Sequence, residues 1–87
     1  MYKYEEMKEK LFCDDGQRTF LRIRDSIKTQ LALAGAVRME EVIANAGGGD
    51  SWTLLACVDR LVELGEIREI PQLEARGQHR IFVTTRM

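Results

Sequence analysis

Few side chains in this sequence have the chemistry of a metal ligand or a nucleophile. The cysteines, Cys13 and Cys57, lie far apart without a CxxC pair, and His79 is the single histidine. Structural zinc sites take four Cys or His ligands at short, regular spacings, which these three residues do not provide. Cys57 falls beside a hydrophobic helical stripe, where a small thiol is common. We therefore expect no metal site and no cofactor, with a redox role for Cys13 as the alternative.

The glycine triplet Gly47–Gly49 is the one glycine-rich stretch, and it does not predict nucleotide binding. Phosphate-binding loops join a strand to a helix and carry a following lysine, whereas this triplet joins two expected helices and has none. A chain of 87 residues builds one modest core rather than a cleft between domains. No Ser/His/Asp set or carboxylate pair stands out. We expect no enzymatic activity.

A cluster of cationic and polar side chains lies near the C-terminus. Arg76, Gln78, His79 and Arg80 surround Gly77. If this segment is an exposed loop between two strands, its arginines suit phosphates or a narrow minor groove. A polar hairpin tip that is only solvated is the alternative.

The charge of the chain is sorted along its length. The formal net charge is −1. Residues 16–46 carry five Lys or Arg against three carboxylates, residues 47–67 one Arg against four, and residues 68–87 four Arg against two. Basic character thus lies in the first long helix, where Arg18, Arg22 and Lys28 could touch phosphates, and in the C-terminal segment. The central segment is acidic.

Composition limits the class of protein. The chain is 45% hydrophobic and 31% charged, which is typical of a globular domain. No apolar run approaches the roughly 18 residues of a membrane span, and the first residues lack the apolar centre of a signal peptide. With two unpaired thiols, this predicts a cytoplasmic protein without membrane contact.

The apolar spacing predicts the helices that position these groups. Residues 1–12 are expected to form a short amphipathic helix, followed by a cap at Asp14 or Asp15. Residues 17–33 form a core-facing helix that ends at Gly35. A short strand at Val37 precedes a short helix, which is expected to stop at Gly47. The third helix starts at Asp50 or Ser51, and its buried stripe consists of Leu54, Val58, Leu61 and Val62.

The period then changes from helical to alternating. Ile67 and Ile70 bracket a short strand that Pro71 ends, and the run RIFVTT is a β-branched and aromatic return strand. The two strands flank a polar loop that contains glycine. This pattern predicts a β-hairpin.

The order helix, short strand, short helix, turn, helix, hairpin resembles the winged helix-turn-helix domain of small bacterial transcriptional regulators. The segments that carry the resemblance are VRMEEVIANAG, TLLACVDRLVELGEI and GQHRIFVTT. The resemblance covers about residues 17–85 and indicates no single family. It implies an α+β, mostly α fold: an N-terminal helix and connector over residues 1–16, and a winged-helix domain with a three-helix core and a hairpin wing over residues 17–87.

The resemblance also implies binding of double-stranded DNA, with the third helix in the major groove and the wing on the backbone. The outward positions of that helix would be Ser51, Trp52, Thr53, Leu55, Ala56 and Asp59. These side chains lack the forked donors that usually read bases, and Asp59 needs Arg60 to offset phosphate repulsion. The expected DNA-binding residues are Ser51, Trp52, Thr53, Leu55, Ala56, Arg60, Arg76, Gln78, His79 and Arg80.

A second hypothesis is a protein-interaction module. Trp52 is the only tryptophan. If it folds over the glycine turn, its role is structural; if it stays exposed beside Leu55 and Ala56, the patch suits a protein partner, because Trp is enriched at interaction hot spots. DNA binding predicts strong salt dependence and a requirement for Arg76 and Arg80, whereas protein binding predicts dependence on Trp52 and Leu55.

The N-terminal helix is the expected dimerisation element. It presents more apolar surface than a terminal segment needs, through Tyr4, Met7, Leu11 and Phe12. These side chains either pack on their own domain or zip against a symmetry mate. Because regulators of this kind commonly read palindromes as dimers, we expect a homodimer.

Overall fold

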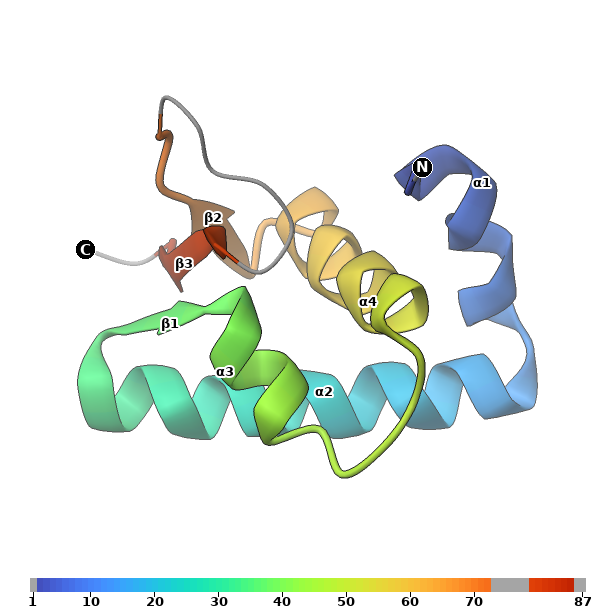
Figure 1. The fold of residues 1–87 in the computed structure, drawn as a ribbon, viewed down its shortest axis with the longest axis horizontal. Helices are drawn as coiled ribbons and strands as arrows, with labels where there is room; N and C mark the ends of the chain where they lie inside the picture. The colour runs from blue at the N-terminus through green and yellow to red at the C-terminus, as the bar shows by residue number, and fades with distance from the viewer. Residues whose placement is uncertain (1, 73–78, 86–87) are drawn as a thin grey trace.

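A computed structural model describes residues 2–72 and 79–85 of the chain. The helices in it are α1 (Tyr4–Met7), α2 (Asp14–Ala34), α3 (Met39–Ala44) and α4 (Ser51–Glu63), with a 3₁₀ helix η1 (Lys8–Phe12) between α1 and α2 (Figure 1). The strands are β1 (Ala36–Arg38), β2 (Ile67–Glu69) and β3 (Ile81–Thr84). The fold is therefore α+β and mostly helical, which confirms that part of the prediction.

α2 begins three residues before the predicted start. Cys13, rather than Asp14 or Asp15, is the N-cap, and its Sγ accepts a hydrogen bond from the Gly16 N–H at 3.3 Å. A Cβ atom at Gly16 would lie 2.1 Å from the Lys10 carbonyl oxygen, so only glycine allows η1 to sit this close to α2. Gly35 ends the helix at φ 79°, as predicted.

The connection between α3 and α4 is made by glycines in left-handed backbone conformations. α3 ends at Ala44, before the predicted stop at Gly47, and φ is positive at all three residues of Gly47–Gly49. Asp50, one of the two predicted caps, is the N-cap of α4, and its Oδ1 accepts a hydrogen bond from the Thr53 N–H at 3.1 Å. This cap fixes the first turn of α4 independently of the rest of the molecule.

The strands form a three-stranded antiparallel sheet in the order β1-β3-β2. Val37 of β1 faces Phe82 of β3, and Arg68 of β2 faces Val83. The predicted pairing of the last two strands is confirmed, and β1 closes the other side of β3. Phe82 and Val37 are buried, so this sheet is part of the core.

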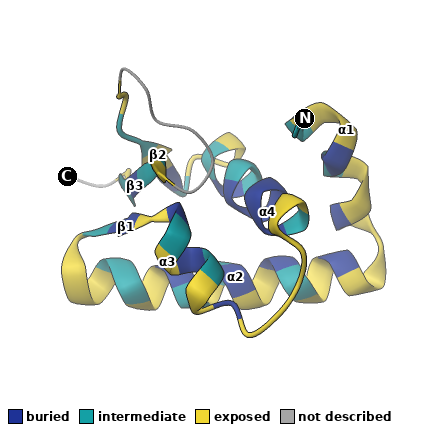
Figure 2. Ribbon diagram, viewed as in Figure 1, coloured by how far each residue is buried: buried dark blue, intermediate teal, exposed yellow. Residues whose placement is uncertain are grey.

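The hydrophobic core surrounds α4. In Figure 1 α4 lies above the long α2, with the sheet on one side and the N-terminal segment on the other; Figure 2 shows α4 as largely buried. Phe20, Ile23 and Ile27 of α2 pack in the same cluster as Met7 and Leu11 of the N-terminal segment. Among the described residues, no helix has the length and apolarity required to cross a bilayer.

Candidate functional site

α4 has two faces, and the one directed away from α2 is the candidate site. Residues three and four apart share a helix face, so Trp52, Ala56, Asp59 and Glu63 lie on this outward face. The stripe Leu54, Val58, Leu61 points in the opposite direction, into the core. A helix that is buried on one stripe only would expose the middle of its outward face to solvent.

The outward face of α4 is instead covered by residues 2–12, which we call the N-terminal strap. Both α1 and η1 contact α4. Within the strap, Met7 is 6% exposed and Leu11 is fully buried. Ala56, at the centre of the outward face, has 0% exposure.

Polar contacts join Tyr2, Tyr4 and Lys8 of the strap to acidic residues of α4. The Tyr2 hydroxyl donates to Asp59 Oδ2 at 2.6 Å, and the Tyr4 hydroxyl donates to Glu63 Oε1 at 2.8 Å. Lys8 Nζ lies 2.8 Å from the other oxygen of Glu63. The carboxylates of α4 thus accept hydrogen bonds from hydroxyl and ammonium groups of the same chain.

These contacts change the proton affinities of the groups involved. Burial raises the pKa of Tyr2, and its hydrogen bond to Asp59 raises it further; burial and the bond to Glu63 act in the same way on the pKa of Tyr4. Donation from Lys8, and then from Arg60, lowers the pKa of Glu63 to about 2. Glu63 is therefore a carboxylate at neutral pH, and both tyrosines are neutral donors.

Arg80 connects this site to the sheet. Its Nη2 lies 2.6 Å from Asp59 Oδ1 and 2.8 Å from Glu69 Oε1, and its guanidinium is centred 5.0 Å from the Phe82 ring. Burial disfavours the charged form, but the bonds to Glu69 and Asp59 outweigh it, and the pKa of Arg80 is raised. Asp59 is consequently shared between Tyr2 of the strap and Arg80, which directly precedes β3.

Two residues of α4 that were expected to be exposed are buried, so the expected exposure of these two side chains is wrong. Leu55 is 7% exposed and Ala56 is 0% exposed. The stripe at Leu54, Val58 and Leu61 covers only one side of α4. The helices α2 and α3, the strand β2 and the strap also contact α4. Neither side chain is accessible at the surface of this structure.

The other predicted residues of α4 have partners or lie at its ends. Ser51 is exposed, and the Thr53 hydroxyl donates to Asp50 Oδ2 at 2.7 Å within the cap. Trp52 is 45% exposed and makes an edge contact with Tyr2, with the ring centroids 6.5 Å apart. Arg60 donates to Glu63 at 2.6 Å and lies over the Phe12 ring at 5.3 Å.

Only part of the predicted arginine loop lies within the described residues. Arg76 and Gln78 lie outside the described residues. His79 is exposed, and its carbonyl oxygen accepts a hydrogen bond from the Gln72 side chain at 3.2 Å. Arg80 is directed toward its two carboxylates, Asp59 and Glu69.

The residues that were expected at a dimer interface lie mainly against their own chain. Met7 and Leu11 are buried, and Tyr4 bonds to Glu63. Of this set, Phe12 stays accessible, with 55% of its surface exposed. These contacts are the packing on the chain's own domain, which the sequence left open as the alternative to a symmetric zipper with a second copy.

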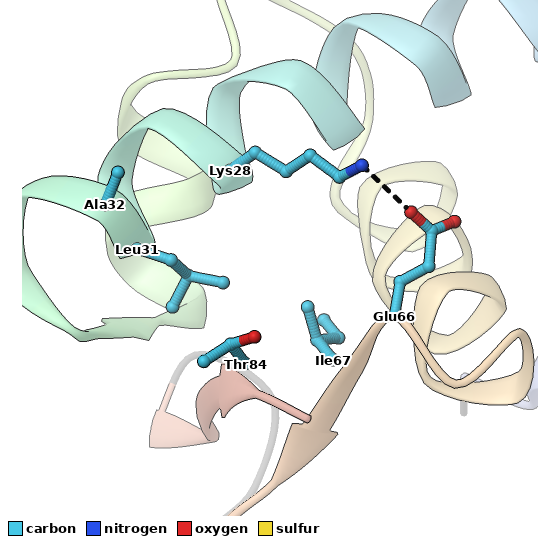
Figure 3. A pocket seen from close by; sticks show the side chains of 6 residues that line it. All are labelled: Lys28, Leu31, Ala32, Glu66, Ile67 and Thr84. Carbon is cyan, nitrogen blue, oxygen red and sulfur yellow. Dashed lines mark ion pairs between the residues drawn. The ribbon is translucent and has the colours of Figure 1, made fainter. Parts of the chain in front are cut away.

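A separate hollow of about 330 Å³ lies between α2 and the sheet. Leu31, Ala32 and Ile67 line it, and the ion pair of Lys28 Nζ with Glu66 Oε1, at 3.2 Å, spans its rim (Figure 3). The cation and the carboxylate thus neutralise each other. Within the described part of the chain, no group of three or more His, Cys, Asp or Glu is arranged to hold a metal ion.

Two contacts of the candidate site, those of Tyr2 and Lys8, were not predicted from the sequence. Their signal was weak: hydroxyl and ammonium donors in the first eight residues match the acidic pair Asp59 and Glu63 one turn apart on α4.

Comparisons of the chain with protein-family models, with curated proteins and with solved structures found no match.

Proposed function

We propose that this chain is a winged-helix domain that binds another protein and does not read DNA sequence with α4. The order of elements and the sheet order β1-β3-β2 support the winged-helix assignment. The observation that carries the functional proposal is Ala56, which is 0% exposed and lies on a helix, α4, that the strap contacts through both α1 and η1. A recognition helix needs its outward face free to enter the major groove.

The distribution of charge supports the same proposal. Affinity for DNA comes largely from cations that replace condensed counterions at phosphates. In the described chain Lys8, Lys28, Arg60 and Arg80 each have a carboxylate within 3.2 Å. Arg22, another expected phosphate contact, donates instead to the carbonyl oxygens of the turn after α3. Phosphate binding by these groups would first have to break existing contacts.

The accessible aromatic side chains are of the kind that protein interfaces use. Trp52 and Phe12 are 45% and 55% exposed, and both lie beside the covered face of α4, next to Tyr2 and Arg60. Trp, Tyr and Arg are the residues most enriched at hot spots. We place the protein in the cytoplasm, because both Cys13 and Cys57 are free thiols.

DNA binding is the second candidate, and the position of His79 favours it. This exposed residue stands at the end of the loop between β2 and β3, next to Arg80 and close in sequence to Arg76 and Gln78. Such a loop suits backbone or minor-groove contact without α4. In that case a homodimer would provide a second loop for a neighbouring half-site.

Titration of a labelled random-sequence duplex with the protein separates the two candidates. DNA anisotropy and Trp52 emission are followed together at low and at physiological salt. The interaction module predicts no change in Trp52 emission and no steeply salt-dependent binding. Binding that disappears in the variant Arg76→Ala but leaves Trp52 unchanged would favour the loop, and binding that also changes Trp52 emission would overturn the proposal.

A further inference from the structure

Polar side chains from three distant parts of the sequence form one connected series, which we call the Asp59 network: Tyr2, Asp59, Arg80 and Glu69. The Tyr2 hydroxyl donates to Asp59 Oδ2 at 2.6 Å, and Arg80 Nη2 donates to Asp59 Oδ1 at 2.6 Å. Arg80 also donates to both oxygens of Glu69, from Nε at 3.1 Å and from Nη2 at 2.8 Å. Because Glu69 is the last residue of β2, the network runs from the strap through α4 to the sheet.

The carboxylate of Asp59 divides its oxygens between the two sides of the network. Oδ2 accepts the short bond from the Tyr2 hydroxyl, while Arg80 makes its short bond to Oδ1 and only a longer one, at 3.4 Å, to Oδ2. The two donors therefore do not compete for one oxygen. A carboxylate is planar, so the donor that fixes one oxygen also fixes the direction of the other. Each contact thus orients Asp59 for its second partner.

The network is less screened by solvent than an ordinary surface ion pair. The side chains of Arg80 and Asp59 are 15% and 17% exposed, whereas those of the surface pair Arg18 and Asp15 are 76% and 90% exposed. Burial, and then the hydrogen bond to Asp59, raise the pKa of Tyr2, and the positive charge of Arg80 opposes this rise. The charge of Arg80 therefore acts on the Tyr2 hydroxyl, although Asp59 lies between them in the series.

Each end of the network meets a further part of the molecule. At the strap end, the Tyr2 ring makes an edge contact with the half-exposed indole of Trp52. At the other end, the Arg80 side chain binds Glu69 of β2, and the Arg80 carbonyl oxygen accepts a hydrogen bond from the Met39 N–H, at the start of α3, at 2.8 Å. The network therefore joins an accessible aromatic side chain to the place where α3, β2 and β3 meet.

We propose that the Asp59 network couples the strap to the sheet, so that loosening one of them loosens the other. Asp59 is the positioning residue, because it acts through Tyr2 on one side and Arg80 on the other. The coupling is reciprocal. A ligand that displaces Tyr2 from Trp52 then loosens β2, and a ligand that disturbs β2 loosens the strap. This inference goes beyond the proposed function, since it holds for either class of ligand.

Amide hydrogen exchange of the full chain, without any ligand, measures the coupling at both ends. The Met7 N–H donates to the Lys3 carbonyl oxygen at 3.2 Å and reports on the strap. The Ile70 N–H donates to the Ile81 carbonyl oxygen at 2.9 Å and reports on the pairing of β2 with β3. The amide of Ile27, in the middle of α2, reports on global unfolding.

One substitution at each end tests whether the effect reaches the other end. Tyr2→Phe removes the hydroxyl from the strap and should speed exchange at Ile70 about fivefold relative to Ile27, which is a typical coupling within one hydrogen-bond network. Glu69→Gln removes the charge that holds the guanidinium and should speed exchange at Met7 by a similar factor.

The matched control is Tyr4→Phe. It removes an equivalent hydroxyl bond between the strap and α4, but the Tyr4 hydroxyl donates to Glu63. The ion pairs of Glu63 are with Lys8 and Arg60, which lie outside the Asp59 network. Relative to global unfolding, this variant should leave exchange at Ile70 close to the wild-type rate.

Three results would overturn the proposal. Equal acceleration at Ile70 in Tyr2→Phe and Tyr4→Phe would mean that any loosening of the strap reaches the sheet without the network. An unchanged rate at Met7 in Glu69→Gln would remove the link in the other direction. Acceleration of all three amides by one factor would show that these contacts contribute only to overall stability. Because no DNA or partner is present, these outcomes are independent of the titration that tests the proposed function.

Discussion

The two faces of α4 are both buried, but by different means. On the inward face Leu54, Val58 and Leu61 are at most 1% exposed and pack with α2 and the sheet. On the outward face the buried residue is Ala56, and polar contacts from a short terminal segment lie around it. The inward face is a core built from large apolar side chains; the outward face has one small buried side chain and is covered by the strap. The two should therefore respond differently to substitution.

The largest expected effect is on the inward face. Leu61→Ala deletes buried methyl groups and leaves a cavity, which should lower the free energy of unfolding by about 2–5 kcal/mol. Urea denaturation followed by far-UV circular dichroism measures this loss. A loss below about 1 kcal/mol would mean that α4 is not anchored in the core as described.

The matching change on the outward face is Ala56→Leu. The added carbons have no room beneath the strap, so we expect a cost of about 1–3 kcal/mol together with release of residues 2–12. Limited proteolysis should cut the strap while the remaining fragment stays folded. Unfolding of the whole chain in one step, with no strap cleavage beforehand, would remove the distinction between the two faces.

A smaller effect is expected where the outward face meets the sheet. Arg80→Ala leaves Asp59 and Glu69 without their shared guanidinium, in a site where the Arg80 side chain is 15% exposed. The expected loss is about 2 kcal/mol, within the range for hydrogen bonds to charged groups. Arg68→Ala, at an exposed position on β2, is the control. Equal unfolding midpoints of the two variants in urea would show that the Arg80 contacts contribute nothing.

The mildest perturbation of the strap is acidification. The pKa of Glu63 is lowered from 4.5 to about 2 in the folded protein, so its contribution is complete above about pH 4.5 and is lost as the pH falls toward 2. Trp52 emission should report strap release over this range, because Tyr2 contacts the indole. Glu63→Gln should reduce that transition, and Glu5→Gln should not. Identical pH profiles for wild type and Glu63→Gln would show that this carboxylate does not hold the strap on α4.

The sequence predicted the inward face of α4 well, because apolar spacing is a local signal. The stripe at Leu54, Val58 and Leu61, the cap at Asp50 and the stop at Gly35 all follow from helix geometry and backbone conformation. The hairpin of β2 and β3 followed from the change to an alternating pattern. These features are decided by residues close together in the chain.

The outward face could not be predicted in this way, because its partner lies more than 50 residues away. Tyr2 meets Asp59, and Tyr4 and Lys8 meet Glu63, across the whole domain. The apolar Leu55 and Ala56 were expected to be exposed because the resemblance assigns that face to DNA. Their apolar character and the lack of Lys or Arg in the first nine residues of α4 have a simpler cause: this part of the helix faces the protein's own chain.

The central claim is that the strap covers α4 in solution and that duplex DNA does not replace it. The most direct test is a nuclear Overhauser experiment between the Tyr2 ring and the Trp52 indole, in the free protein and with duplex DNA at low salt. We predict cross-peaks between the two rings that persist when DNA is added. Their absence in the free protein, or their loss on adding DNA with shifts at Ser51 and Thr53, would contradict the account.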